Sequence, residues 1–128
     1  MWKKQMDETM QQAIGLAPVM MRAPGGLDTP YIHAGVNMPV VHWSRISGDS
    51  NGTDYINSNY SLIVRRVAYS QDGEIVLCHD LTNYAGRLAA DYLPVLKERN
   101  VLCVTILDMF AIRNRPMPLD TAINDCLP

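Results

Sequence analysis

Cys78 and His79 are the only neighbouring thiol and imidazole in the chain. A cysteine acts as a nucleophile when a base lies within hydrogen-bonding reach of its thiol. The periodicity around these residues predicts a helix, and neighbours on a helix point about 100° apart, so the two cannot act as a pair. We therefore interpret Cys78 as a thiol packed beside the apolar stripe of that helix. His79 and Asp80 are interpreted as part of its solvated face.

A metal site would need several histidine, cysteine or carboxylate side chains at ligand spacing. His33 and His42 are nine residues apart, and neither has a cysteine or carboxylate at such a spacing. The cysteines Cys78, Cys103 and Cys126 are odd in number and widely spaced, which argues against a disulfide framework. The sequence therefore predicts no metal, no cofactor and no catalytic residue.

Two glycine-containing stretches, Pro24–Gly26 and Gly48–Gly52, are the candidates for a phosphate-binding loop. Neither matches the dinucleotide fingerprint or the P-loop with its lysine and hydroxyl residue, so both are interpreted as ordinary loops. A net charge of −2 is also too close to neutral for a protein that holds nucleic acid by neutralising phosphates.

A chain of 128 residues has room for one domain, so the elements that would position these groups are expected to share one core. No apolar run approaches the roughly 20 residues of a membrane-spanning helix. The first residues lack the apolar core of a signal peptide, which predicts folding in a reducing cytoplasm. Between Ala23 and Val64 charge is so sparse that part of this stretch is expected to meet another protein. The charged residues there are Asp28, Arg45, Asp49 and Asp54.

The first half of the chain predicts a helix followed by a β-hairpin. Apolar residues recur at helical spacing from Lys3 to Leu16, and Pro18 ends the pattern. The β-branched and aromatic stretch Met38–Ile46 predicts a strand. The polar loop Gly48–Asp54 then leads to a second predicted strand, Tyr60–Tyr69, which makes a hairpin with a long tip.

The second half predicts a long helix, a strand and a tail. The helix spans Leu77–Leu93 on its apolar repeats, and Pro94 ends or kinks it. The nearly uncharged Val101–Leu107 predicts a strand buried on both sides. From Asn114 the proline-rich chain is expected to run extended. We expect an α/β (α+β) fold in one small domain, with a mostly antiparallel sheet packed by one long and one N-terminal helix.

The order of these elements resembles that of tail-terminator and head-to-tail joining proteins of tailed bacteriophages. The resemblance covers Gly15 to Val104 and rests on the loop between Leu27–Pro30 and Met38–Pro39. Three pieces carry it: GGLDTPYIHAGVNMPVVHW, NYSLIVRRVAYSQDGE and LTNYAGRLAADYLPVLKERN. The stretch from Pro30 to Pro39 is longer than in that family, and the proline-rich end has no place in it.

The resemblance implies a structural virion protein without enzymatic activity or cofactor. The subunits would close a homohexameric ring that caps the tail tube and joins it to the head-side connector. Its partners would be other copies of itself, the tail tube protein and neck or connector proteins. DNA would pass through without specific binding, and no membrane would be involved. The protein would reside in the virion neck and, during assembly, in the host cytoplasm.

A closed ring needs two different faces on each subunit. We expect subunit or partner contacts from five residues: Arg45, Tyr55, Arg65, Arg66 and Tyr69. Arg65 and Arg66 would point to opposite faces of the predicted strand. Two acidic residues of the polar loop, Asp49 and Asp54, are expected to face the DNA channel, because a neutral or acidic lining lets DNA slide.

Two alternatives from other functional classes remain open. One is a small oligomeric ligand-binding or regulatory protein that holds an anionic small molecule between subunits. Arg65, Arg66, Trp43 and His42 would form its site. The other is a small hydrolase that uses the thiol of Cys78 or Cys103.

Overall fold

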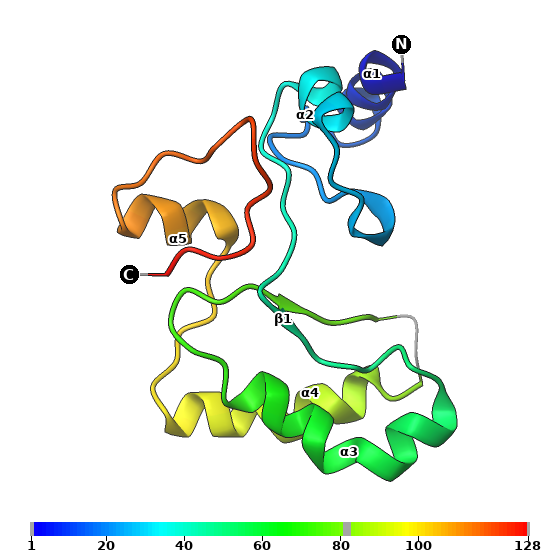
Figure 1. Ribbon diagram of the computed structural model, residues 1–128, viewed down its shortest axis with the longest axis vertical. Helices are drawn as coiled ribbons and strands as arrows, with labels where there is room; N and C mark the ends of the chain where they lie inside the picture. The colour runs from blue at the N-terminus through cyan, green and yellow to red at the C-terminus, as the bar shows by residue number, and fades with distance from the viewer. Residues whose placement is uncertain (1, 81–82, 128) are drawn as a thin grey trace. The chain divides into compact units, whose positions relative to one another are not determined.

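The structure is a computed structural model that describes residues 2–80 and 83–127. Helices, short strands and loops follow one another along the chain, coloured from the N-terminus to the C-terminus in Figure 1. The chain divides into two compact units. The first consists of Met1–His42 and Pro116–Asn124, and the second of Trp43–Arg115 and Asp125–Pro128. No helix among the described residues is long and apolar enough to cross a membrane.

The first unit begins with α1 (Trp2–Ile14), which confirms the predicted N-terminal helix. A 3₁₀ turn, η1 (Pro24–Gly26), and α2 (Pro30–Val36) follow. Thr29 caps α2, because its side chain accepts a hydrogen bond from the amide of Ile32. Isolated parallel bridges join Met21 to Val40 and Val41 to Ile123. The core of this unit is small and apolar: Ala23, Val36, Met38 and Val40.

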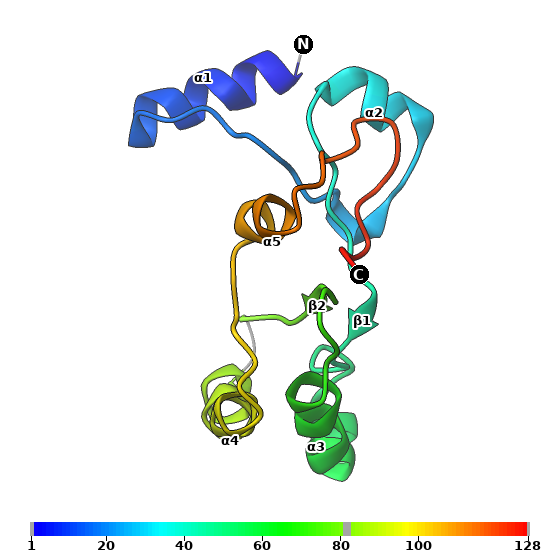
Figure 2. The same ribbon diagram turned by 90° about the vertical axis from the view of Figure 1, so that its left-hand side faces the viewer.

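The second unit contains a parallel strand pair and two packed helices. β1 (Arg45–Ile46) pairs with β2 (Val76–Leu77), with Arg45 opposite Val76. α3 (Thr53–Ala68) lies beside α4 (Ala85–Glu98), as Figure 2 shows. Ile56 and Ile63 of α3 are buried against Leu88 of α4. α5 (Ile106–Ile112) follows, capped by the side chain of Thr105.

The predicted hairpin is wrong, although the coarse assignment to the α/β class holds. Residues 60–68 continue α3 instead of forming a strand. Ile56, Ile63 and Val67 are buried at helical spacing, so packing against α4 overrides the β-branched composition. The strands that do form are parallel, so the expected antiparallel sheet is also wrong. Arg65 and Arg66 consequently follow one another on a helix and do not occupy opposite faces of a strand.

The second half of the chain departs from its predictions at the start of the long helix and in the segment that follows it. Leu77 lies in β2, and α4 starts at Ala85 and continues through Pro94 to Glu98. Leu81, part of the predicted stripe, lies outside the described residues. The segment 101–105 is loop instead of a buried strand, and α5 begins at Ile106. The tail from Asn114 contains no helix among the described residues and makes isolated bridges at Ile123 and Asp125.

Gly73 allows the chain to approach its own C-terminal segment. Its φ of +84° is rare for side-chain-bearing residues, and a Cβ atom there would overlap the carbonyl oxygen of Cys126. The amide of Cys126 donates to the carbonyl of Gly73 over 2.7 Å. Gly73→Ala should therefore lower the free energy of unfolding by about 2–4 kcal/mol, measured by urea denaturation. Gly86→Ala is the matched control, because its Cβ would meet open space. An equal decrease in the free energy of unfolding of the two variants would contradict this prediction.

An ion pair ties β1 to the turn before β2. Arg45 donates from Nε and Nη2 to the two carboxylate oxygens of Glu74, over 2.7 and 2.8 Å. The side chain of Glu74 is only 13% exposed. Burial alone would raise the pKa of Glu74, but the hydrogen bonds from Arg45 and from the amide of Gln71 lower it below its ordinary 4.5.

Glu74→Gln should lower the free energy of unfolding by about 1–3 kcal/mol at pH 7, because it removes a charged acceptor. A lowered pKa in the folded state means that this stabilisation is complete above pH 4.5 and disappears as the pH falls through the lowered value. Urea denaturation at pH 7 and pH 3 measures the difference. Arg45→Met should lower the free energy of unfolding by a similar amount at pH 7. A loss in Glu74→Gln that is equally large at both pH values would contradict the ion pair as its source.

Candidate acid–base site

A buried carboxylate and an imidazole meet beyond the ends of the two parallel strands. Asp49 follows β1 by three residues, and His79 follows β2 by two. Because parallel strands end at the same edge, their following residues are brought together. Oδ1 of Asp49 lies 2.7 Å from Nδ1 of His79, and Oδ2 accepts the His79 backbone amide over 2.7 Å. Ser47 donates its hydroxyl to Oδ1 over 2.8 Å.

The environment keeps Asp49 ionised. The residue is 3% exposed, and this burial by itself would raise the pKa of its carboxyl group. The hydrogen bonds from the ring and backbone of His79 and from Ser47 outweigh burial and hold the pKa below the ordinary value of 3.8. A buried carboxylate with three donors is therefore charged at neutral pH.

The contact with Asp49 orients the ring of His79. An ionised carboxylate can only accept, so Nδ1 of His79 carries the proton that it donates to Asp49. Nε2 makes no hydrogen bond with the described residues, and the side chain is 30% exposed. Nε2 of the neutral ring can accept a proton from a bound molecule and return it later. This arrangement is typical of general acid–base chemistry.

The turn between Ser47 and Asp49 is held from α3. Arg66 donates from Nη1 to the carbonyl of Ser47 and to the hydroxyl of Tyr55, both over 3.4 Å. Gly48 makes this approach possible, since its φ is +90° and a Cβ atom would lie 2.7 Å from that Nη1. Arg66 therefore supports the turn that carries Asp49.

The thiol next to His79 is a poor nucleophile. Partial burial raises the pKa of Cys78, and the negative charge of Asp49 raises it further. A protonated thiol lacks the reactivity of a thiolate. The chemistry of this site therefore rests on the imidazole and the carboxylate, which weakens the alternative of a Cys78 hydrolase.

Most residues predicted to form interfaces lie apart from one another. Arg45 is paired with Glu74, and Tyr69 is 57% exposed beneath the guanidinium of Arg99. The structure brings together only Tyr55 and Arg66. Arg65 and Asp54 are exposed on α3, whereas Asp49 is buried. Nothing tests an interface or channel role for these residues, which stays a prediction.

Sequence reasoning missed the pairing of Asp49 with His79. It placed Asp49 on an exposed loop and His79 on the solvated face of a helix. One sequence pattern could have indicated the pair. The short apolar run Ile75–Leu77 predicts a buried strand that ends just before His79. Two strands ending before a carboxylate and an imidazole would have suggested the pair.

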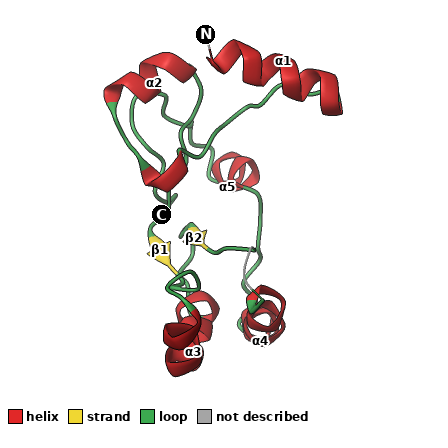
Figure 3. Ribbon diagram, turned by 90° about the vertical axis from the view of Figure 1, so that its right-hand side faces the viewer, coloured by secondary structure: helices red, strands yellow, loops and turns green. Residues whose placement is uncertain are grey.

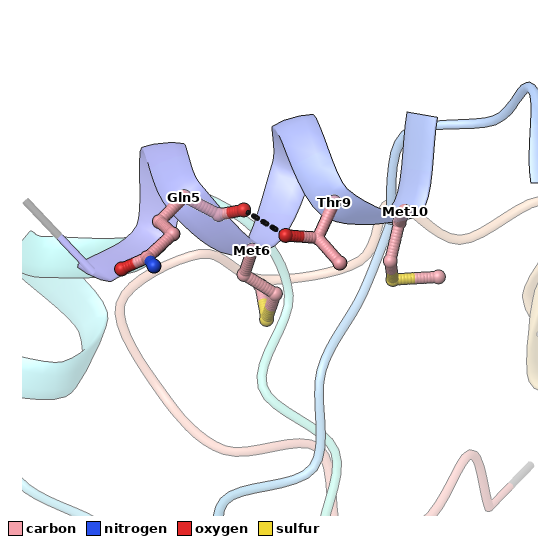
Figure 4. A pocket seen from close by; sticks show the side chains of 4 residues that line it. All are labelled: Gln5, Met6, Thr9 and Met10. Atoms are coloured by element: carbon pink, nitrogen blue, oxygen red, sulfur yellow. Dashed lines mark hydrogen bonds between the residues drawn. The ribbon is translucent and has the colours of Figure 1, made fainter. Parts of the chain in front are cut away.

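The first unit also holds an imidazole beside a carboxylate, but there the ring is the buried partner. His33 is buried with Nε2 against the carboxylate of Asp28. A hollow of about 330 Å³ lies along α1, and Figure 4 shows the Thr9 hydroxyl donating to the carbonyl of Gln5 there. Its lining has no titratable group: Gln5, Met6, Thr9 and Met10.

Several solved structures have a fold similar to that of this chain. The T48 deacetylase, solved with its substrate, is 22% identical with a TM-score of 0.75 over 92% of this chain. A family 4 acetyl xylan esterase from Clostridium thermocellum, solved with a cobalt ion, is 20% identical with a TM-score of 0.77 over 95%. The chain therefore shares part of the fold of these two enzymes. A peptidoglycan deacetylase from Bacillus subtilis is 21% identical with a TM-score of 0.70 over 84%.

Identities of 20–22% show a common fold and no more. The chain also spans only 56%, 60% and 52% of the lengths of these three proteins. No protein-family model matches the chain, and no curated protein matches its sequence.

The resemblance to phage tail terminators is wrong, because the matching folds belong to carbohydrate deacetylases and esterases. The expectations that rested on it are corrected with it: a structural virion protein, the absence of enzymatic activity, and a place in the virion neck. The element order that suggested the resemblance depended on a strand at Tyr60–Tyr69, where the chain forms α3. Homo-oligomerisation and the other predicted partners are not tested and stay predictions.

Proposed function

We propose that this chain is the acid–base part of a carbohydrate deacetylase or esterase, with His79 as the residue that moves the proton. The observation that carries the proposal is the hydrogen bond between Nδ1 of His79 and buried Asp49, which leaves Nε2 available to a substrate. The fold supports the same reaction class, since the similar structures are deacetylases and esterases.

Removal of an acetyl group needs two proton transfers. Nε2 of His79 accepts a proton as the oxygen of water forms a bond to the acetyl carbonyl carbon. The bond from that carbon to the sugar oxygen or nitrogen then breaks, and Nε2 donates the proton to the leaving atom. Acetate and a free hydroxyl or amino sugar result. Asp49 keeps the ring in one tautomer and stabilises its positive charge between the two transfers.

The proposed substrate is an acetylated carbohydrate. One similar structure is an acetyl xylan esterase and another a peptidoglycan deacetylase. Both O-acetylated and N-acetylated sugars are therefore candidate substrates. His79 can protonate either kind of leaving atom. The described residues do not distinguish the two, so both belong in the assay.

The described residues do not fit a metal site. One similar structure holds a cobalt ion. Within residues 2–80 and 83–127, however, no three histidine, cysteine or carboxylate side chains come together as ligands. His79 already uses Nδ1 for Asp49. We therefore derive the proton transfers from His79 and Asp49 alone.

Acetate release tests the proposal. The purified chain is incubated with acetylated xylan and, separately, with N-acetylglucosamine oligomers, and free acetate is measured enzymatically. We expect release from at least one substrate and its loss in His79→Asn. No release from either, or equal release by His79→Asn, would overturn the proposed function.

A further inference from the structure

The hydrogen bonding between β1 and β2 changes at the candidate site. The two strands lie side by side, and the loop that follows β1 leads into α3 (Figure 3). The amide of Ser47 donates to the carbonyl of Leu77 over 3.1 Å. In a parallel ladder, the next hydrogen bond would run from the amide of His79 to the carbonyl of Ser47. That amide donates instead to Oδ2 of Asp49, over 2.7 Å.

The carbonyl group of Ser47, which leaves the ladder at this point, needs another donor. Ser47 is almost fully buried, and a buried carbonyl group without a donor is destabilising. Arg66 of α3 supplies the donor, because its Nη1 lies 3.4 Å from the Ser47 oxygen. The hydroxyl of Tyr55 accepts from the same Nη1 over 3.4 Å, which fixes the guanidinium group.

The amide of His79 has two acceptors within the same turn. One is the carboxylate of Asp49, and the other is the carbonyl of Ser47. Gly48 lies between them with a φ of +90°, and a glycine gives the peptide groups on either side freedom to turn. A Ser47 carbonyl held by Arg66 does not turn back toward the His79 amide. The amide therefore stays with Asp49, whose other oxygen accepts from Nδ1 of the ring.

We propose that Arg66 is a positioning residue for the acid–base pair. By holding the carbonyl of Ser47, it keeps the amide of His79 on Asp49. The ring of His79 then keeps the orientation that leaves Nε2 available. The expected effect on the reaction rate rests on the proposed function, whereas the expected effect on hydrogen bonding does not.

The first measurement identifies the acceptor of the His79 amide. In NMR of the isotope-labelled full chain, the scalar coupling across a hydrogen bond joins the amide nitrogen to the acceptor's carbon. We expect coupling to Cγ of Asp49 in the wild-type protein. In Arg66→Met the coupling should move to the carbonyl carbon of Ser47. Arg66→Lys retains a charged donor and should keep the wild-type coupling.

The second measurement is the hydrolysis of p-nitrophenyl acetate. Arg66→Met should lower kcat about 10–100-fold and change KM by less than about twofold, because a misoriented ring affects the transition state and not substrate binding. Arg66→Lys should restore most of this rate. Arg65→Met is the matched control, since Arg65 is the neighbouring arginine on α3 and is exposed. Its kcat and its His79 coupling should equal those of the wild-type protein.

Three outcomes would overturn the inference. They are a wild-type coupling to Ser47, an Arg66→Met protein that keeps the coupling to Asp49, and an equal fall of kcat in Arg65→Met. Circular dichroism shows whether Arg66→Met folds. If it does not, Arg66→Gln takes its place, because the shorter side chain also removes the contact. A wild-type protein that hydrolyses no substrate, but whose coupling moves in Arg66→Met, would contradict the proposed activity and leave the positioning role of Arg66 standing.

Discussion

Replacing His79 with asparagine is expected to slow the hydrolysis of p-nitrophenyl acetate by about 10²–10⁴-fold, the contribution of a positioned proton-transfer group. Asparagine keeps a similar size but cannot accept the proton of an attacking water. The aryl leaving group needs no protonation, so this substrate isolates the role of Nε2 as a base. The release of p-nitrophenol measured by absorbance gives the rate directly.

Cys78→Ser is the control for this experiment. It changes the neighbouring residue and removes the thiol, so it should leave the rate unchanged. If Cys78→Ser lost the activity and His79→Asn kept it, the thiol would be the reactive group and our assignment of His79 would be wrong. Circular dichroism of both variants separates a chemical effect from unfolding.

Asp49→Ala is expected to lower the free energy of unfolding by about 3–5 kcal/mol at pH 7, because it removes the charged acceptor of a buried cluster. Three donors lose their partner: the Ser47 hydroxyl, the His79 amide and the His79 ring. Asp49→Asn retains one acceptor oxygen, so it should lower the free energy of unfolding less than Asp49→Ala does. Urea denaturation measures both variants.

The effect of Asp49 on stability should depend on pH with a definite sign. The pKa of its carboxyl group is lowered in the folded state, so the stabilisation is complete above the ordinary value of 3.8 and fades as the pH falls through the lowered value. The difference between the wild-type protein and Asp49→Asn should therefore shrink from pH 7 to pH 3. A difference that stays constant over this range would show that the cost comes from packing and not from charge.

Asp49 should also determine the tautomer of His79. Nitrogen NMR of the wild-type ring is expected to show the proton on Nδ1, where it donates to the carboxylate. In Asp49→Ala this preference should disappear, and the hydrolysis rate should fall with it. An unchanged tautomer would mean that Asp49 serves stability alone.

Local sequence signals were sufficient for the helices with strong periodicity. The apolar repeats at Met6 and Met10 predicted α1, and those at Leu88 and Tyr92 predicted most of α4. The same signal failed for α3, because Ile63, Val64 and Val67 favour a strand by composition. The burial of Ile56 and Ile63 against α4 is what makes this segment a helix.

By itself, the sequence determined the α/β class, the N-terminal helix and most of α4, since each depends on residues close together in the chain. The tertiary structure decided the parallel pairing of β1 with β2 and, through it, the meeting of Asp49 with His79. These strands are two residues long, too short to show a period, and the paired side chains are thirty residues apart. A contact of this kind leaves no local pattern. It forms because parallel strands end at one edge and bring the residues that follow them together.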